Sequence, residues 1–150
     1  MPDPEIQTVE LRACRPEDFE GVLALLRQLW PDKHLEAAAL RAVYDRLLAS
    51  GTQTCLCASA RGRVVGFGSL SVKNQLWQAG YSGRVDELVV DREYRNRGIG
   101  TRLLDELVAA ARAQGCRCVE LDSAFHRQAA HRFYERRGFE SRAYLFSKKW

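Results

Sequence analysis

Residues 85–104 read VDELVVDREYRNRGIGTRLL and decide the fold. The apolar, β-branched run before Asp91 predicts a strand. Apolar positions from Ile99 to Ala111 recur at helical spacing and predict a helix. Between them, residues 95–100 follow the pattern Arg-x-x-Gly-x-Gly. A strand that leads through a glycine-containing loop into a helix directs unpaired backbone N–H groups at one point, where the helix dipole favours negative charge.

This loop is predicted to bind phosphate. Gly98 and Gly100 have no Cβ, so an anion can approach the main chain closely. Arg92, Arg95, Arg97 and Arg102 add positive charge around the loop. The spacing fits neither the dinucleotide fingerprint Gly-x-Gly-x-x-Gly nor the nucleotide P-loop. The pattern therefore favours a pyrophosphate site, with a plain helix start among solvated arginines as the alternative.

Residues 84–104 resemble the acetyl-CoA-binding motif of the GNAT N-acetyltransferase superfamily. In that family a strand ends in Val five residues before an Arg or Gln, which is followed by x-x-Gly-x-Gly/Ala. Val90, Arg95, Gly98 and Gly100 match this pattern in order and spacing.

A second stretch, AHRFYERRGF at residues 130–139, is similar to the Ala-x-x-Phe-Tyr-x-x-x-Gly-Phe signature of the same family. The resemblance is sharp over residues 84–139. One position departs from it: Arg127 stands where the family often has an Asn that contacts the pantetheine arm.

The resemblance implies one GNAT acetyltransferase domain over residues 1–150 with a GNAT-like α/β fold. In that family the mixed sheet is splayed. The apolar patterns along this chain predict the element order β-α-α-β-β-β-α-β-α-β, which is mixed α/β. The expected strands are residues 6–13, 52–60, 63–72, 81–90, 116–122 and 139–149; the expected helices are 16–30, 33–49, 98–114 and 127–137; residues 73–83 form a loop. The crossover through helix 98–114 predicts that its flanking strands are parallel. The tail after Gly138 is short for this family, so a single strand and strand exchange with a second subunit in a homodimer both remain open.

The co-substrate that the resemblance implies is acetyl-CoA. The main-chain groups of Leu88 and Val90 would bind the thioester oxygen. The full set of residues expected to bind the co-substrate is Leu88, Val89, Val90, Arg95, Asn96, Arg97, Gly98, Ile99, Gly100, Thr101 and Arg127.

Acetyl transfer to an amine requires two proton transfers. A free amine with a pKa near ~10 is nucleophilic in roughly one molecule per thousand at pH 7. A carboxylate could accept its proton, directly or through a water chain. Asp86 and Glu87 are adjacent and would face opposite sides of a regular strand; we favour Glu87 as the base. The family motif places Tyr134 as the general acid for the leaving thiolate, with packing beside Phe133 as the alternative.

The acceptor amine is expected near Asp86, Asp122, Trp30, Trp77 and Tyr81. Carboxylates at the first two positions resemble those of amino-sugar-phosphate and aminoglycoside acetyltransferases. Trp and Tyr suit an amphipathic or cationic amine, although they suit core packing equally well. The expected function is acetyl transfer from acetyl-CoA to a primary amine of a small molecule by direct attack on the thioester. A protein Lys or N-terminal acetyltransferase and a non-catalytic acyl-CoA-binding module are the alternatives.

Composition indicates what kind of protein this is. The 150 residues are 46% hydrophobic and 28% charged, with a formal net charge of +4, which is ordinary for one globular domain. No apolar run approaches the ~18–20 residues that span a membrane, and no signal peptide is recognisable; we expect a cytoplasmic protein. No nucleic-acid-binding pattern is present. Five cysteines, an odd count, argue against a disulfide framework. The two Cys-x-Cys pairs lie in strand-like runs without a nearby His, so no metal is expected.

Overall fold

The computed structural model describes residues 8–150. The chain divides into two compact units, one ending at Glu120 and one running from Leu121 to Trp150. The expectation of one domain over the whole chain stays a prediction.

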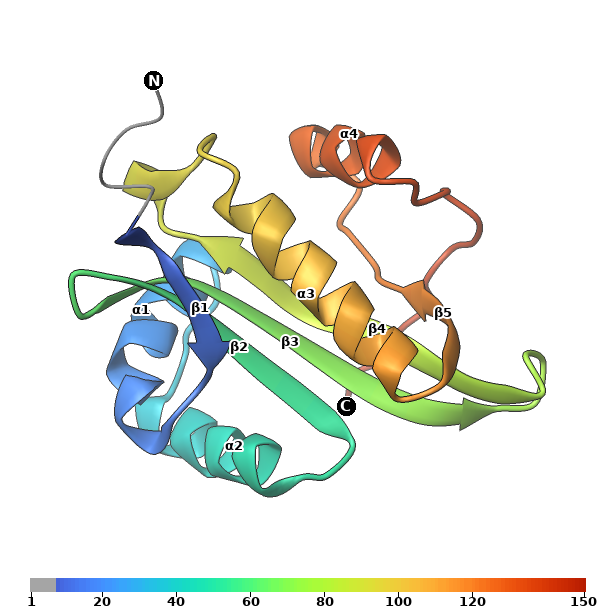
Figure 1. The fold of residues 1–150 in the computed structure, drawn as a ribbon, viewed down its shortest axis with the longest axis horizontal. Helices are drawn as coiled ribbons and strands as arrows, with labels where there is room; N and C mark the ends of the chain where they lie inside the picture. The colour runs from blue at the N-terminus through green and yellow to red at the C-terminus, as the bar shows by residue number, and fades with distance from the viewer. Residues whose placement is uncertain (1–7) are drawn as a thin grey trace. The chain divides into compact units, whose positions relative to one another are not determined.

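The first unit alternates strands and helices in nearly the expected order (Figure 1). Its elements are β1 (Glu10–Ala13), a 3₁₀ helix (Pro16–Asp18), α1 (Phe19–Leu29), α2 (Ala37–Ala49), β2 (Gln53–Ala60), β3 (Arg63–Gln75), β4 (Gly80–Val90), a second 3₁₀ helix (Arg92–Tyr94), α3 (Ile99–Ala113) and β5 (Cys116–Glu120). The second unit contains α4 (Gln128–Arg136).

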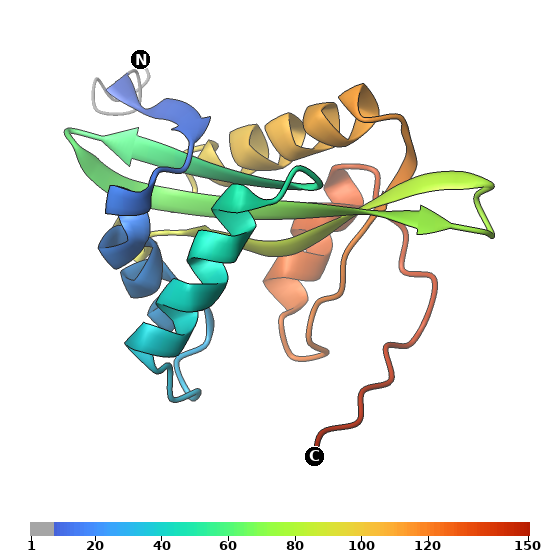
Figure 2. The same ribbon diagram turned by 90° about the horizontal axis from the view of Figure 1, so that it is seen from below.

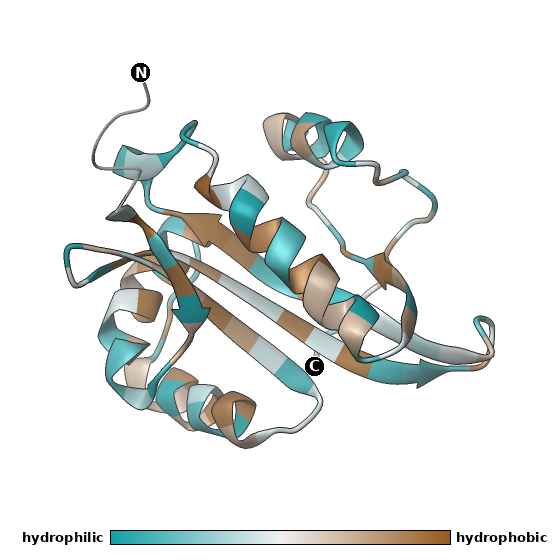
Figure 3. Ribbon diagram, viewed as in Figure 1, coloured by the Kyte–Doolittle hydropathy of each residue, from teal (hydrophilic) through white to brown (hydrophobic). Residues whose placement is uncertain are grey.

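The strands form one sheet in the order β1-β2-β3-β4-β5. All neighbours are antiparallel except β4 and β5, which are parallel as the crossover predicts. Helices α1 and α2 cover one face and α3 covers the other (Figure 2). The alternating apolar positions of the strands therefore supply two cores, and Figure 3 shows these apolar bands along the central strands.

Two glycines of β3, Gly66 and Gly68, let α3 lie close to the sheet, because neither has a Cβ. A Cβ at Gly66 would stand 2.9 Å from Leu103 Cδ1, and one at Gly68 would stand 2.9 Å from Leu107 Cδ1. Both leucines are fully buried. A larger residue at either glycine would force these leucine side chains to move in the packed layer between β3 and α3.

The sheet opens beside β4. Pairing with β5 covers only Tyr81 to Arg84, whereas β4 continues to Val90. No strand among residues 8–150 pairs with this side of β4 beyond Arg84. The opening corresponds to the splay that the family resemblance implies.

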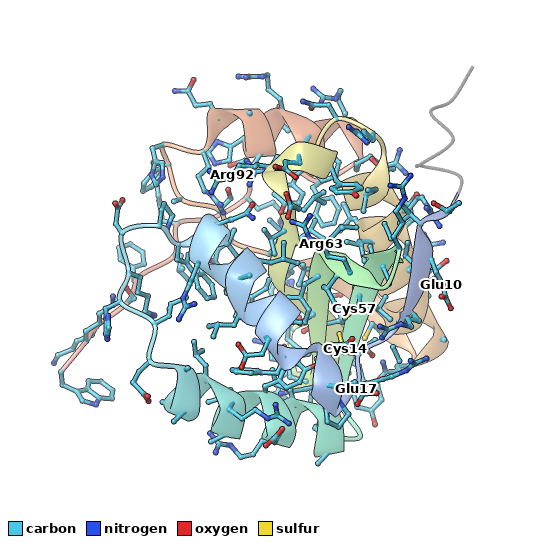
Figure 4. All side chains as sticks on the ribbon, turned by 90° about the vertical axis from the view of Figure 1, so that its left-hand side faces the viewer. Glu10, Cys14, Glu17, Cys57, Arg63 and Arg92 are labelled. Carbon is cyan, nitrogen blue, oxygen red and sulfur yellow. The ribbon has the colours of Figure 1, made fainter. Side chains whose placement is uncertain are left out.

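The five cysteines are free thiols; four lie in β2 and β5, and Cys14 directly follows β1. Cys55 and Cys57 on β2 are buried, as the strand pattern predicts. The sulfur atoms of Cys14 and Cys57 lie 2.7 Å apart and share a hydrogen bond (Figure 4).

Several predicted boundaries are wrong. The structure has no strand over residues 139–149, because this tail joins no ladder that could satisfy its backbone groups. β5 ends at Glu120, so Asp122 does not end a strand. The predicted loop 73–83 shrinks to a turn because β3 and β4 continue pairing to Gln75 and Gly80.

Helix α2 begins four residues later than predicted. Glu36 caps it, accepting hydrogen bonds from the backbone N–H groups of Ala38 and Ala39. The first predicted strand also begins late, at Glu10; residues 6 and 7 lie outside the described part of the chain.

Asp18 fastens the start of α1 to β1. Its carboxylate is 7% exposed and accepts hydrogen bonds from Arg12 Nη1 at 2.7 Å, Arg12 Nη2 at 2.9 Å and the Arg15 N–H at 2.7 Å. The Arg12 hydrogen bonds lower the pKa of Asp18 despite the opposing effect of burial. A carboxyl group with a lowered pKa stabilises the fold above its unfolded pKa, near ~3.9, and loses this contribution as pH falls through its folded pKa.

We therefore expect Asp18→Asn to lower the free energy of unfolding by about 2 kcal/mol near neutral pH, because hydrogen bonds to a charged group are lost. The difference from wild type should shrink below about pH 4. Urea denaturation at several pH values measures both effects. Asp45→Asn is the matched control: Asp45 is an exposed partner of Arg41 on α2 and should cost less than about 0.5 kcal/mol. Equal losses for the two variants would contradict the assignment.

Candidate functional site

The open side of β4 carries backbone groups that β3 does not use. The N–H of Asp91 donates to Val65 O at 2.8 Å. Antiparallel partners alternate between hydrogen-bonded and non-hydrogen-bonded pairs, so the main-chain groups of Leu88 and Val90 point away from β3. These are the two positions that the sequence predicts for the thioester oxygen.

The glycine loop, residues 95–101, joins this strand region to α3. Arg95 Nε donates to Val90 O at 3.0 Å, which folds the loop back onto the end of β4. Asn96 and Gly98 have left-handed backbones, with φ of 62° and 84°. The loop therefore turns sharply just before α3 begins at Ile99.

The N-terminus of α3 is open to an anion. Gly98 is its N-cap residue, and no side chain caps the helix. A Cβ built on Gly98 meets no heavy atom within 4 Å. The first-turn N–H groups of a helix have no partner within the helix, so this open space is where a phosphate oxygen would fit.

Two of the arginines around the loop, Arg97 and Arg102, make contacts with groups outside the loop. Arg97 lies over the Tyr94 ring, with 5.3 Å from Cζ to the ring centroid. Arg102 instead donates from Nη2 to Val9 O at 3.1 Å, toward β1.

Arg63 pairs with the buried Asp91 at 2.9 Å, and Figure 4 shows its position beside the strands. Asp91 also accepts from the Glu93 N–H at 2.9 Å and so fixes the start of the connection to the loop.

A β-bulge separates the two candidate bases. Ser69 of β3 pairs with Glu87, and the next residue, Leu70, pairs with Val85. Asp86 is the extra residue, so the strict alternation of a regular strand does not hold here. Asp86 is on the surface and lies 3.3 Å from Arg84 Nε.

Glu87 is half-buried and held by Ser69. Burial raises the pKa of its carboxyl group, the Ser69 hydrogen bond lowers it, and the negative charge of Asp86 raises it again. A carboxylate with a raised pKa is better matched to accepting a proton near neutral pH. The sequence analysis missed Ser69, because only the strand register shows which residue of β3 lies opposite Glu87.

The second unit places Tyr134 on α4 among aromatic rings. Its ring centroid lies 5.3 Å from that of Phe133 and 5.8 Å from that of Phe139. Burial raises the pKa of the Tyr134 phenol, and the charge of Arg127 acts in the opposite direction. The phenol therefore stays protonated at neutral pH, as a proton donor must.

The predicted acceptor residues are not all brought together. Trp30 follows α1 and packs against the core, with Lys33 Nζ 5.6 Å from its ring centroid. Trp77, 84% exposed, occupies the β3–β4 turn, and Tyr81 follows it at the start of β4. Within the first unit, α1 and this turn lie at opposite ends of the sheet (Figure 1). Asp122 belongs to the second unit.

Within residues 8–150, no helix combines the length and apolarity needed to cross a membrane. Across the same residues, no three His, Cys, Asp or Glu side chains gather as a metal site.

A mixed sheet that opens beside β4, followed by a glycine loop and an uncapped helix, defines an acyltransferase of the GNAT class. The chain belongs to the acetyltransferase (GNAT) family, whose model matches residues 19–139. It is therefore an N-acetyltransferase by family.

Two relatives are similar over nearly their whole length. A glucosamine 6-phosphate N-acetyltransferase from Trypanosoma brucei brucei is 32% identical over 139 residues, which cover 91% of this chain and 92% of that protein. An aminoalkylphosphonate N-acetyltransferase from Salmonella typhimurium is 34% identical over 139 residues, covering 93% and 90%. Among solved structures, a putative acetyltransferase from Agrobacterium tumefaciens matches with a TM-score of 0.84 and 28% identity, covering 94% of this chain and 99% of that one.

Proposed function

We propose that this protein transfers an acetyl group from acetyl-CoA to the primary amine of a small molecule. The observation that carries the proposal is the uncapped N-terminus of α3 behind the left-handed Gly98, where a diphosphate would be held. Acetyl-CoA supplies an acetyl group activated as a thioester. Residues of the glycine loop, Val89 and Arg127 would bind it, and the outward N–H groups of Leu88 and Val90 would face the thioester oxygen.

In the proposed reaction the amine nitrogen attacks the thioester carbonyl directly. The new bond joins nitrogen to the acetyl carbon, and the carbon–sulfur bond breaks. Glu87 takes the proton of the amine, and the Tyr134 hydroxyl gives its proton to the leaving thiolate. Stabilisation of the developing oxyanion by main-chain N–H groups typically supplies several kcal/mol.

The two relatives support a proposal for the acceptor class. Glucosamine 6-phosphate and aminoalkylphosphonates both combine an amine with a phosphorus oxyanion, and the enzymes that act on them align with this chain over about nine-tenths of its length. We infer that the acceptor of this protein also carries both groups. Asp86, Asp122, Trp30, Trp77 and Tyr81 are the residues from which its binding site would be drawn. Cytoplasmic location and a second copy as partner stay predictions.

An acceptor screen that follows free CoA tests the proposal. We expect turnover with amines that carry a phosphate or phosphonate. Specificity should be at least about tenfold higher for an amino-sugar phosphate than for the same sugar without phosphate, because an unpaired anion site rejects the truncated substrate. Peptides and polyamines complete the panel. Binding of acetyl-CoA without turnover on any amine would instead identify a non-catalytic acyl-CoA-binding module, and turnover on peptides alone would identify a protein acetyltransferase.

A further inference from the structure

Ser69 and Glu87 form a reciprocal pair across the β3–β4 ladder. The Ser69 hydroxyl donates its proton to Glu87 Oε2. The Ser69 hydroxyl oxygen in turn accepts a hydrogen bond from the backbone N–H of Glu87 at 3.1 Å. A serine hydroxyl has one proton to donate, so the N–H bond from Glu87 orients this proton toward the Glu87 carboxylate.

The β-bulge explains why a side chain makes these contacts. Asp86 is inserted between Val85 and Glu87 without a partner on β3, so the ladder is interrupted beside Ser69. The N–H of Glu87 then needs another acceptor, since an unpaired buried N–H is costly. The Ser69 hydroxyl supplies that acceptor and is itself only 3% exposed.

Ser69 donates a hydrogen bond to this carboxylate, and other polar groups lie around the pair. Cys55 of β2 pairs with Ser69 and lies on the same face of the sheet as Glu87. Burial raises the pKa of the Cys55 thiol to about 11, and the charge of Glu87 adds to this effect. On β4 itself, the negative charge of Asp86 raises the pKa of Glu87 and the positive charge of Arg84 lowers it. Helices α1 and α2 present mainly apolar residues to this face, apart from Tyr44, whose hydroxyl donates to Arg15 O at 2.7 Å.

We propose that Ser69 is a positioning residue that holds the Glu87 carboxylate in one orientation to receive the proton of the acceptor amine. The inference rests on the proposed function and names a residue for the same site. Ser69 itself contacts no substrate in this assignment and acts through Glu87.

Removing the Ser69 hydroxyl should change the pKa of Glu87 in a definite direction. The Ser69 hydrogen bond favours the charged carboxylate, so its loss should raise the pKa of Glu87 further. A base with a higher pKa is protonated over a wider range of acidic pH. The acid limb of the rate profile should therefore move to higher pH in Ser69→Ala, and the alkaline plateau should change much less.

The experiment compares four proteins: wild type, Ser69→Ala, Ser69→Thr and Ser71→Ala. The threonine variant keeps the hydroxyl. Ser71→Ala is the matched control on the same strand and face, since Ser71 lies opposite Arg84 in the register. In Ser69→Ala we expect kcat to fall about tenfold at about pH 6 and by less than about threefold on the plateau, which is the size expected for one hydrogen bond to a charged group. The other two variants should follow the wild-type profile.

A second measurement does not depend on activity. Carboxyl ¹³C NMR follows the titration of Glu87, and Glu87→Gln assigns its resonance by removing it. The midpoint should rise in Ser69→Ala and stay near wild type in Ser69→Thr and Ser71→Ala. If Ser69→Ala does not fold, Ser69→Cys, with its weaker donor, should show the same upward displacement.

The outcomes separate the two proposals. An unmoved Glu87 midpoint in Ser69→Ala, or the same profile change in Ser71→Ala, would overturn the role of Ser69 while leaving acetyl transfer intact. A wild-type protein that acetylates no amine would overturn the proposed function, and the proton-accepting role with it. A displaced midpoint in such a protein would then report only that Ser69 holds the carboxylate.

Discussion

Gly98→Ala is expected to weaken acetyl-CoA binding by about a hundredfold. The Cβ of alanine would occupy the open space in front of the first turn of α3, where the predicted diphosphate approaches the main chain. Hydrogen bonds from N–H groups to a charged ligand contribute about 1.5–3 kcal/mol each, and the loss of one or two gives a change of this size. Isothermal titration calorimetry with acetyl-CoA measures the dissociation constant directly.

Gly62→Ala separates this effect from backbone strain. Gly62, in the turn between β2 and β3, has φ of 75° and equally open space for a Cβ. Both variants therefore place alanine in the left-handed region and should lose a similar, small amount of stability. Only Gly98→Ala should lose affinity for acetyl-CoA. A dissociation constant within about threefold of wild type in a folded Gly98→Ala protein would remove the glycine loop from the binding site.

Local patterns were sufficient to predict the strand, loop and helix that form the proposed co-substrate site. Gly98 sits between a β-branched run and a helical apolar pattern, and both patterns are short-range properties of the sequence. The structure keeps the strand, the loop and the helix within one or two residues of their predicted bounds. The outward direction of Leu88 and Val90 also follows from alternation once β3 is known as the partner.

The proton-transfer half depends on pairing between distant residues. Ser69 and Glu87 are separated by 18 positions, and they meet only because Asp86 forms a bulge. A single inserted residue changes which side chains share a face, and no local propensity marks Asp86 as the insertion. The tail after Gly138 is a second example: apolar residues at Tyr144 to Phe146 suggest a strand, but a strand forms only where a partner edge accepts it.

Tyr134→Phe is expected to lower kcat by about a hundredfold with little change in acetyl-CoA affinity. A positioned proton donor typically contributes 10²- to 10⁴-fold, roughly, and the substitution removes only the hydroxyl. Burial raises the pKa of the phenol, so the group holds its proton at neutral pH and can give it to a departing thiolate. The phenylalanine ring keeps the aromatic contacts with Phe133 and Phe139, so α4 should keep its structure.

Tyr144→Phe is the matched control, because Tyr144 lies in the same unit but is 75% exposed. Steady-state release of CoA gives kcat for both variants, and calorimetry gives their affinity for acetyl-CoA. A parallel loss of kcat and affinity in Tyr134→Phe would indicate that the phenol binds the co-substrate rather than protonating the thiolate. A kcat within about threefold of wild type would leave the thiolate to be protonated by water, because the hydroxyl would then contribute no more than a single weak hydrogen bond.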